Sequence, residues 1–531
     1  MPEGTQIING REYVYEYKSV WNKEKQRSEQ KREYIGRIID GEFVPNKKYL
    51  LRKEIEKEKS SKKPGPKPTA ECKRLFAGAT WLLDQIAAKT GVAADLKSCF
   101  PSLHKEMQSL MYFLALEPES KLYRFKRWAL THEHPYGKDI PSQRSSELLP
   151  LIGEGGKMEF MKRQSQRRAE NEYLFYDSTS ISSYSEQLKQ VKYGKNKEGD
   201  GLAQINLALV LGQGSGLPVY YRKLPGNITD VMTVENLLAG ISHLDLKKVR
   251  LVMDRGFYSE KNVNELFKGH HKFIIGAKIS LKYIQERLKG ERADFDKREN
   301  YNSATGLFIK TQTIDWPYKE EKPRSGIRVE GKRRAYLHIY YNDQKATDAK
   351  IKFNKMLDGL EEEILSGKRQ PDKEKIYSKY YKITETPVRG VRISPKQDVI
   401  DKVRQNYGYF ALLSNSVKDP VEALKIYRSK DMIEKAFSDL KDRLNMRREA
   451  VSSEENLEGK LFLQFGALIL DSYVKKAMDE SNLFKNYTMQ ELFDELDVIE
   501  MFQQPGRQAF FGEITGKQRK LYAALGVQPP A

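Results

Sequence analysis

The hydrophobic and polar positions along the chain change their period several times. In residues 32–50 (REYIGRIIDGEFVPNKKYL), strand-forming residues surround Asp40-Gly41, a pair typical of a tight turn, so we expect a β-hairpin there. From Glu71 to about Glu170 the apolar spacing is helical, and Gly91 at the end of LFAGATWLLDQIAAKTG predicts a helix C-terminus. The chain therefore begins with a predicted hairpin and continues with a small helical module.

A second change of period begins at Glu172. Short apolar runs flanked by Gly, Asp and Ser predict strands in EYLFYDSTS, AQINLALVLGQGSGLPVYYRKLP, KKVRLVMDRGF and KFIIGAKI. The glycines of GQGSG lie between two strand patterns without the spacing of a nucleotide-binding loop, which predicts a hairpin turn. Because VMTVENLLAGISHL has helical spacing, strands and helices interleave, and we expect a mixed α/β core.

Residues 280–405 differ from both neighbours, since short strand-like pieces and one charged helix lie there among Lys, Glu and turn residues. This pattern predicts an insertion into the core, because YGYFALLSN resumes a strand at 407–415 and helical patterns then follow to the C-terminus. The segment KKPGPKP (62–68) is typical of a stiff basic linker, and it lacks the Arg-Gly-Arg core of a minor-groove hook. The domains that we expect are 1–70, 71–170, 171–279, 280–405, 406–465 and 466–531.

The charge of the chain favours a nucleic-acid partner. The 531 residues include 93 Lys and Arg against 73 Asp and Glu, a net charge of +20, and residues 1–70 alone hold 17 against 11. Lys and Arg contacts to phosphates release condensed counterions, which favours binding to DNA or RNA. The alternative is a generally basic surface that aids solubility. An aromatic content of 11% is typical of a folded chain, because disordered chains are aromatic-poor.

Several other classes of function lack the residues that they need. Two cysteines, Cys72 and Cys99, cannot form a four-thiolate zinc site or a disulfide framework. The apolar runs are far shorter than a membrane span, and the N-terminus lacks the pattern of a signal peptide, so we expect a cytoplasmic protein without a membrane partner. The pairs His132/His134 and His270/His271 lack metal-ligand spacing and are interpreted as surface or capping residues. We find no Gly-rich Lys-Ser/Thr loop for ATP.

Two aspartates stand at the ends of predicted strands. Asp177 follows residues 173–176 and precedes Ser-Thr-Ser, whereas Asp254 follows residues 249–253 and precedes Arg-Gly-Phe. A capping role is the simpler explanation for either residue alone. An ionised carboxylate at the end of a buried strand is nevertheless costly unless a positive charge lies nearby. Both residues are therefore candidates for a charged site.

A third acidic candidate lies in residues 426–447, which have the spacing of one continuous helix. At about 100° per residue, Tyr427, Lys430, Glu434 and Lys441 fall within an arc of about 60°, beside a separate apolar stripe. A solvated face with weak ion pairs is the alternative. Asp177, Asp254 and Glu434 together could form a three-carboxylate site, whose hard oxygen ligands suit Mg²⁺ or Mn²⁺. Two such ions about 4 Å apart assist phosphodiester displacement, and the neighbouring Tyr and Lys side chains could then position phosphates.

Four segments resemble those of DDE transposases of bacterial insertion sequences, in the superfamily named after insertion sequence four. They are FYDSTSISSYS, LPGNITDVMTVENL, LVMDRGFYS and IYRSKDMIEKAFSDLK. Tyr427, Glu434 and Lys441 match the family's Tyr-Arg-Glu-Lys signature in spacing. Lys430 stands at the arginine position, which keeps the charge and loses the bidentate fork.

The resemblance implies a ribonuclease H-like catalytic core interrupted by a β-rich insertion, with a helical N-terminal DNA-binding region and a helical C-terminal region. Together with the charge, it predicts that the basic hairpin and the helical module of residues 1–170 hold inverted-repeat DNA. It implies two Mg²⁺ ions on Asp177, Asp254 and Glu434, with Mn²⁺ able to substitute, and a homodimer that pairs terminal inverted repeats and joins them to target DNA. In some relatives an insertion tryptophan stacks on a flipped base, so Trp316 is a candidate DNA contact, although it fits a surface loop equally well. The alternatives are a nuclease of the same fold without strand transfer and a non-catalytic DNA-binding derivative.

Overall fold

The structure is a computed structural model, and its chain divides into two compact units. One comprises Met1–Lys73 with Gln503–Ala509, and the other Arg74–Phe502 with Phe510–Ala531. The residues that the structure describes are 3–22, 27–61, 72–118, 120–167, 172–185, 187–197, 199–244, 246, 248–321, 328–386, 390–444, 446, 448–449, 451, 453–504 and 506–531. The predicted KKPGPKP linker lies outside them.

The first unit is an antiparallel sheet in the order β1-β2-β3-β4, followed by one helix. Its elements are β1 (Glu3–Ile8), β2 (Arg11–Asn22), β3 (Arg27–Ile39), β4 (Glu42–Pro45) and α1 (Lys47–Ser61). Ile39 pairs with Glu42 across Asp40-Gly41, and both turn residues have positive φ, so the predicted hairpin is confirmed. Asn9-Gly10 makes the same kind of turn between β1 and β2, which the sequence analysis did not identify.

In the second unit, the N-terminal helices surround a long C-terminal helix. The helices are α2 (Gly78–Thr90), α3 (Val92–Cys99), α4 (His104–Leu116), α5 (Phe125–Trp128), α6 (Ser142–Leu148), α7 (Glu154–Arg167), α16 (Glu454–Glu480), α17 (Met489–Asp497) and α18 (Gly516–Ala524). Gly91 ends α2 with a φ of 76°, as predicted. The helix α16, which packs against α4, runs across the boundary that we expected at residue 465. The strands β5 (Lys73–Phe76), β18 (Glu500–Gln503) and β19 (Phe510–Phe511) form a small sheet.

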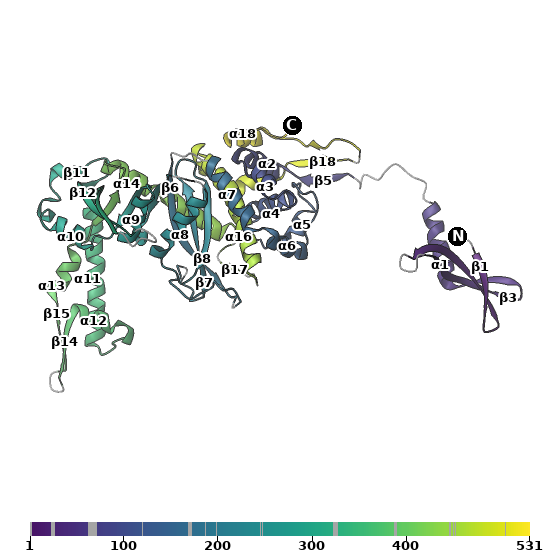
Figure 1. The fold of residues 1–531 in the computed structure, drawn as a ribbon, viewed down its shortest axis with the longest axis horizontal. Helices are drawn as coiled ribbons and strands as arrows, with labels where there is room; N and C mark the ends of the chain where they lie inside the picture. The colour runs from purple at the N-terminus through teal and green to yellow at the C-terminus, as the bar shows by residue number, and fades with distance from the viewer. Residues whose placement is uncertain are drawn as a thin grey trace. The chain divides into compact units, whose positions relative to one another are not determined.

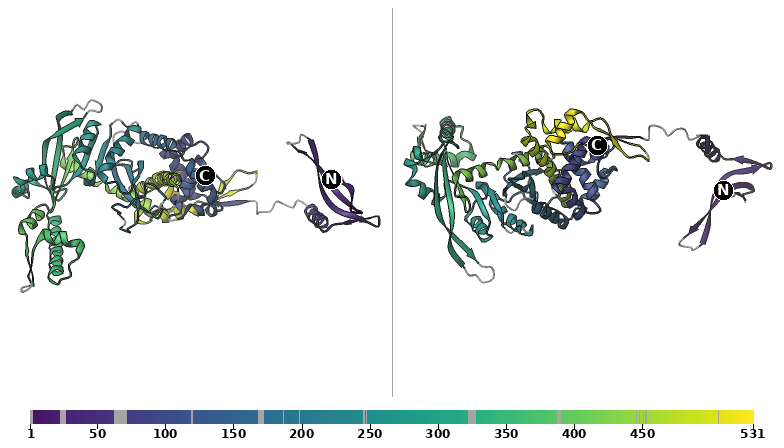
Figure 2. Two further views of the ribbon diagram at one scale, coloured as in Figure 1. Left: turned by 60° about the horizontal axis from the view of Figure 1, so that its bottom comes forward. Right: turned by 90° about the horizontal axis from the view of Figure 1, so that it is seen from above.

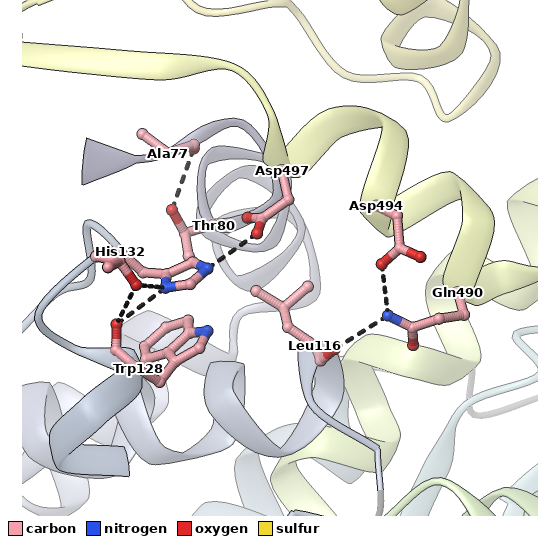
Figure 3. A network of polar contacts seen from close by, with 9 residues as sticks. Ala77, Thr80, Leu116, Trp128, His132, Gln490, Asp494 and Asp497 are labelled. Carbon is pink, nitrogen blue, oxygen red and sulfur yellow. Dashed lines mark hydrogen bonds and ion pairs between the residues drawn. The ribbon is translucent and has the colours of Figure 1, made fainter. Parts of the chain in front are cut away.

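The interpretation of His132 and His134 as surface residues was wrong, because both side chains are buried. The His132 ring stacks on Trp128 at 4.5 Å between centroids, and its Nε2 lies 2.9 Å from a carboxylate oxygen of Asp497 (Figure 3). Burial alone would lower the pKa of His132, but the hydrogen bond and charge of Asp497, together with the Trp128 carbonyl and the charge of Glu117, outweigh burial and raise that pKa. This contact joins the N-terminal helices to α17.

A ten-stranded mixed sheet forms the centre of the second unit. Its strands are β6 (Tyr173–Ser183), β7 (Gln204–Gly212), β8 (Pro218–Pro225), β9 (Arg250–Met253), β10 (Lys272–Ala277), β11 (Tyr301–Asn302), β12 (Leu307–Glu321), β13 (Arg328–Tyr341), β16 (Tyr409–Ser414) and β17 (Arg448–Glu449). They follow the order β11-β12-β13-β16-β10-β9-β6-β7-β8, with β17 beside β6. The predicted mixed α/β core is therefore confirmed. GQGSG connects β7 to β8 as the predicted hairpin turn, and the Glu172 carboxylate accepts hydrogen bonds from the N–H groups of Gly214 and Ser215.

Residues 280–405 contribute to the central sheet as well as forming a structure of their own. The long hairpin β12–β13 pairs with β16 and so extends the sheet (Figure 2). The remaining elements are α10 (Lys282–Lys289), α11 (Asp343–Leu365), α12 (Glu374–Tyr380), β14 (Tyr381–Thr386), β15 (Gly390–Pro395) and α13 (Gln397–Arg404). The helix α11 runs from the sheet to the β14–β15 hairpin (Figure 1), and α11, α12 and α13 share a separate hydrophobic core around Phe353 and Tyr377.

Among the described residues, no helix is both long and apolar enough to cross a membrane.

Candidate catalytic cleft

The sheet register places Asp177 and Asp254 side by side. The strands β6 and β9 are parallel neighbours, and Tyr176 pairs with Met253. Asp177 and Asp254 are the next residue on each strand, so their backbones leave the paired region at the same level. The prediction that Asp177 ends a strand was wrong, because β6 continues to Ser183 and Asp177 still pairs with Leu209 of β7, whereas Asp254 does follow the last residue of β9. The two aspartates nevertheless meet where β9 ends, and both side chains line a single open cleft.

Asp254 is held by two groups from the segment that carries the third candidate. The Tyr427 hydroxyl donates a hydrogen bond of 2.5 Å to Asp254 Oδ1, and Lys430 Nζ lies 3.6 Å from the same oxygen. Burial by itself would raise the pKa of Asp254, but this hydrogen bond, the Lys430 charge, and the backbone N–H and charge of Arg255 together outweigh burial and lower that pKa. Asp254 is therefore an ionised, oriented carboxylate at neutral pH.

The prediction of one continuous helix over residues 426–447 was wrong. The chain forms α14 (Pro420–Arg428) and α15 (Asp431–Asp442), joined by Ser429 and Lys430. These two residues keep helix-like dihedral angles, but the N–H of Lys430 bonds the carbonyl of Tyr427, three residues back. This tighter hydrogen bond does not change the direction of the chain, so Tyr427, Lys430 and Glu434 still lie on the same side of the helical segment.

Glu434 reaches the cleft from the first turn of α15. Its carboxylate lies 3.4 Å from Lys430 Nζ, which is also the ammonium that faces Asp254. One lysine therefore lies between the two carboxylates. Glu434 is 57% exposed and Asp254 40%, so both remain open to a ligand from solvent.

Asp177 is the most strongly perturbed carboxylate of the cleft. Burial raises the pKa of Asp177 to about 6, and the nearby charge of Asp230 adds to the rise. Lys197, which lines the same cleft, and the Ser178 N–H, 2.7 Å from Asp177 Oδ1, act in the opposite direction without cancelling the effect. The carboxyl of Asp177 therefore lacks enough positive charge nearby to compensate for its burial.

Asp230 is a fourth acidic residue in the cleft, and the sequence analysis did not single it out. It begins α8 (Asp230–His243), lines the cleft, and accepts a hydrogen bond of 2.7 Å from the Ser178 hydroxyl. A Cβ on Gly256 would lie 3.1 Å from its Oδ2, which places Asp230 beside the turn that follows Asp254. An acidic residue in a first helical turn is so common as a dipole partner that its position alone gives no functional signal.

Gly276 is a second residue that the sequence analysis missed. It lies in β10, next to β9, and a Cβ there would meet Tyr427 Oη at 2.9 Å and the Arg255 backbone nitrogen at 2.8 Å. Only a residue without a side chain leaves room for the tyrosine hydroxyl to reach Asp254. A single Gly within a strand pattern suggests that other groups approach the backbone closely, but the sequence does not show which groups these are.

The two remaining candidates do not join the cleft. Lys441 follows Glu434 by about two turns of α15 and is not among the described residues that line the cleft. Trp316 belongs to β12 and is only 3% exposed; its Nε1 donates to Asn264 Oδ1 at 2.9 Å, and its ring packs edge-on against Tyr283. The interpretation of Trp316 as a surface-loop residue was wrong, because its ring is enclosed in the core; its contact with a flipped base stays a prediction.

The donor set of the cleft fits a hard divalent cation. Asp177, Asp230, Asp254 and Glu434 supply carboxylate oxygens alone, which suit Mg²⁺ and Mn²⁺. Among the described residues, no three acidic, histidine or cysteine side chains are close enough as they stand to surround an ion. In this structure the Lys430 ammonium occupies the space between Asp254 and Glu434. Binding of a metal cation therefore requires the carboxylates to move closer together.

Comparison with known proteins places the chain in a family. Residues 169–470, more than half of the chain, match the family model described as a transposase DDE domain, so the chain belongs to that family of phosphoryl-transfer enzymes. No curated protein matches the chain by sequence. Among solved structures, it is similar to the piggyBac transposase synaptic complex with hairpin DNA, with 10% identity, a TM-score of 0.38, and coverage of 79% of this chain and 76% of that one.

Proposed function

We propose that the protein is the transposase of a bacterial insertion sequence of the insertion-sequence-four superfamily. It binds the terminal inverted repeats of the element and catalyses metal-dependent DNA cleavage and strand transfer in the cytoplasm. The observation that carries the proposal is the meeting of Asp177, Asp254 and Glu434 in one cleft, from two adjacent parallel strands and one helix. Two copies would hold the two ends of the element.

The sheet order supports a ribonuclease H-like core. The strands β8, β7 and β6 are antiparallel neighbours, and β6, β9 and β10 are parallel, in the order β8-β7-β6-β9-β10. Asp177 lies within the central strand β6 and Asp254 directly follows its neighbour β9, and the segment that begins with α10 separates both from Glu434. We propose that 171–279 and 406–465 form this core, that 280–405 is an insertion fused to its sheet, and that 1–70, 71–170 and 466–531 are additional domains.

Asp177, Asp254 and Glu434 would hold two Mg²⁺ ions, with Mn²⁺ as a substitute. Bound there, the metal would supply Lewis-acid stabilisation of the attacking and leaving oxygens of the phosphodiester. Tyr427 orients Asp254 through its hydrogen bond and keeps that carboxylate ionised. Lys430, already between Asp254 and Glu434, would turn its ammonium toward a DNA phosphate once the carboxylates hold another cation.

The test is a cleavage and joining assay with purified protein, Mg²⁺, and duplex DNA that contains the ends of the sequence carrying its gene. We expect cutting at the ends and joining of the freed 3′-hydroxyls to a second DNA. Cutting without joined product would identify a nuclease without strand transfer. Binding to the ends without cutting in either Mg²⁺ or Mn²⁺ would overturn the catalytic proposal and leave a DNA-binding derivative.

Asp230 provides a prediction that separates a metal-site role from a structural one. Replacing Asp230 by asparagine removes one negative charge from the cleft, so we expect a roughly tenfold rise in the Mg²⁺ concentration needed for half-maximal cleavage. The measurement is a Mg²⁺ titration of cleavage. Glu235→Gln is the matched control, since Glu235 lies on the same helix but pairs with Lys261 outside the cleft. An unchanged Mg²⁺ requirement in Asp230→Asn would show that Asp230 only supports Ser178.

A further inference from the structure

The N-terminal sheet separates its charges between its two faces. Directly paired residues of neighbouring strands point to the same face. The pairs Tyr15–Tyr34, Tyr17–Arg32 and Tyr13–Arg37 therefore share one face, and Glu16–Glu33 and Lys18–Lys31 share the other. Extending this register assigns Arg11, Arg32, Arg37 and a single acid, Glu42, to the first face, and Glu3, Glu12, Glu16, Glu29, Glu33, Lys18 and Lys31 to the second. We call these the arginine face and the glutamate face.

The helix α1 packs on the glutamate face. Arg52 lies 2.5 Å from Glu16 and 3.5 Å from Glu33, and Lys48 lies 2.6 Å from Glu33. The ring of Tyr49 contacts Phe43, which the register also places on this face. Glu16 and Glu33 are thus paired with basic residues of the helix, and α1 fixes which side of the sheet is turned inward.

The arginine face has a layer of aromatic rings. Tyr34 packs edge-on against Tyr13 and Tyr15, with ring centroids 6.0 Å and 5.8 Å apart. The Arg32 guanidinium lies 4.7 Å from the centre of the Tyr15 ring and donates to Gln6 Oε1, which also accepts from the Tyr34 hydroxyl. These contacts hold Arg32 and the rings in place before any ligand binds. A preorganised surface loses less entropy on binding than a mobile one.

The same face is accessible to a large partner. Arg11, Arg32 and Arg37 are exposed, as are Tyr34 at 40% and Trp21 at 63%. Exposed Arg and aromatic side chains on one face, with nearly all of the acids on the other, complement an anionic polymer and not a neutral or basic protein surface. Arg is also the residue that contacts guanine and phosphate with two hydrogen bonds at once.

We infer that the arginine face of β1–β4 binds duplex DNA, with Arg32 and Arg37 contacting bases or phosphates in a groove. Strands in a sheet lie about 4.8 Å apart, so β2 and β3 together are narrow enough for the major groove, which is about 12 Å wide. The bulge between Val14 and Tyr15 increases the local twist of this pair, which helps a ribbon follow a groove. The inference deepens the proposed function, on which it rests for the choice of DNA as partner.

Binding by the full-length chain is measured without divalent metal, so that it does not depend on catalysis. The probes are a duplex from the DNA that flanks the gene, an unrelated duplex of equal length, and the corresponding single strand. Arg32→Gln with Arg37→Gln is expected to weaken binding to the flanking duplex at least about tenfold and to reduce the slope of log K against log salt by up to about 2. Arg11→Gln with Arg37→Gln leaves Arg32 on Tyr15 and should show a loss in the same direction.

The matched control removes two charges from the opposite face. Lys18 and Lys31 pair directly with each other and are exposed, so Lys18→Gln with Lys31→Gln makes the same change in net charge on the same strands. We expect the control to change affinity less than about threefold. Equal losses in the arginine and lysine variants would overturn the inference, as would tighter binding to the single strand. A protein that binds as expected and never cuts DNA would leave the inference intact and contradict only the proposed function.

Discussion

Replacing Glu434 by glutamine is expected to abolish DNA cleavage and joining while leaving DNA binding unchanged. The change keeps the shape of the side chain but removes one of the charges that draw a divalent cation into the cleft. A loss of about 4 kcal/mol of transition-state stabilisation corresponds to about a thousandfold in rate. The measurement is the initial rate of cleavage at saturating DNA, with binding followed separately.

Asp431→Asn is the matched control for this variant. Asp431 lies in the same first turn of α15 and carries the same charge, but it is not among the described residues that line the cleft. A comparable loss in Asp431→Asn would indicate a general effect of charge at the helix N-terminus. Full activity of Glu434→Gln would remove Glu434 from the proposed metal site.

Replacing Arg443 by methionine is expected to destabilise the protein, by up to about 1.4 kcal/mol more at pH 8 than at pH 5. Asp471 of α16 is fully buried, and its Oδ2 lies 3.4 Å from Arg443 Nε at the end of α15. The other oxygen, Oδ1, has no hydrogen-bond partner among the described residues. Arg443→Met would leave a buried carboxylate without its cation, and denaturant unfolding measures the cost.

Two controls distinguish this cost from ordinary loss of packing. Lys475→Met breaks the more exposed pair between Lys475 and Asp439 on the same two helices, and should cost only about 1 kcal/mol. Burial raises the pKa of Asp471 to about 7, so at about pH 5 its carboxyl is neutral in the folded protein. The penalty of Arg443→Met should therefore stay constant below about pH 6, where the carboxyl is neutral with or without Arg443, and grow as the pH rises through about 7 to 8. A penalty independent of pH would show that the arginine acts by packing alone.

The parts of the site that are encoded locally could be predicted from the sequence. Asp177 and Asp254 each follow an apolar run, and the parallel pairing of β6 and β9 brings them together, although only Asp254 precedes a turn, because β6 continues to Ser183. The break before α15 could not be predicted, because Ser429 and Lys430 fit a helical pattern and only their hydrogen bonds differ. So slight a change leaves side chains on the same side of the helical segment. Tyr427 and Glu434 therefore still share one side, as the helical spacing predicted.

Features that depend on contacts distant in sequence were missed or misinterpreted. The spacing of 280–405 indicated an insertion, but not that β13 would pair with β16 and become part of the central sheet. Trp316 has charged neighbours in the sequence, yet alternate residues of a strand point to opposite faces, and its own face is buried. Gly276 and Asp230 matter because of Tyr427 and Ser178, which reach them from other elements.

The order in which the ribosome makes these parts has a consequence for regulation. The arginine face is complete once β4 has been synthesised, whereas the cleft lacks Glu434 until α15 has emerged, almost four hundred residues later. A chain that terminates within 280–405 would keep the surface that we propose for DNA but would have no third carboxylate. If the proposed function holds, such incomplete products occupy the ends of the element without cutting them, and premature termination of translation then reduces transposition instead of producing an unregulated nuclease.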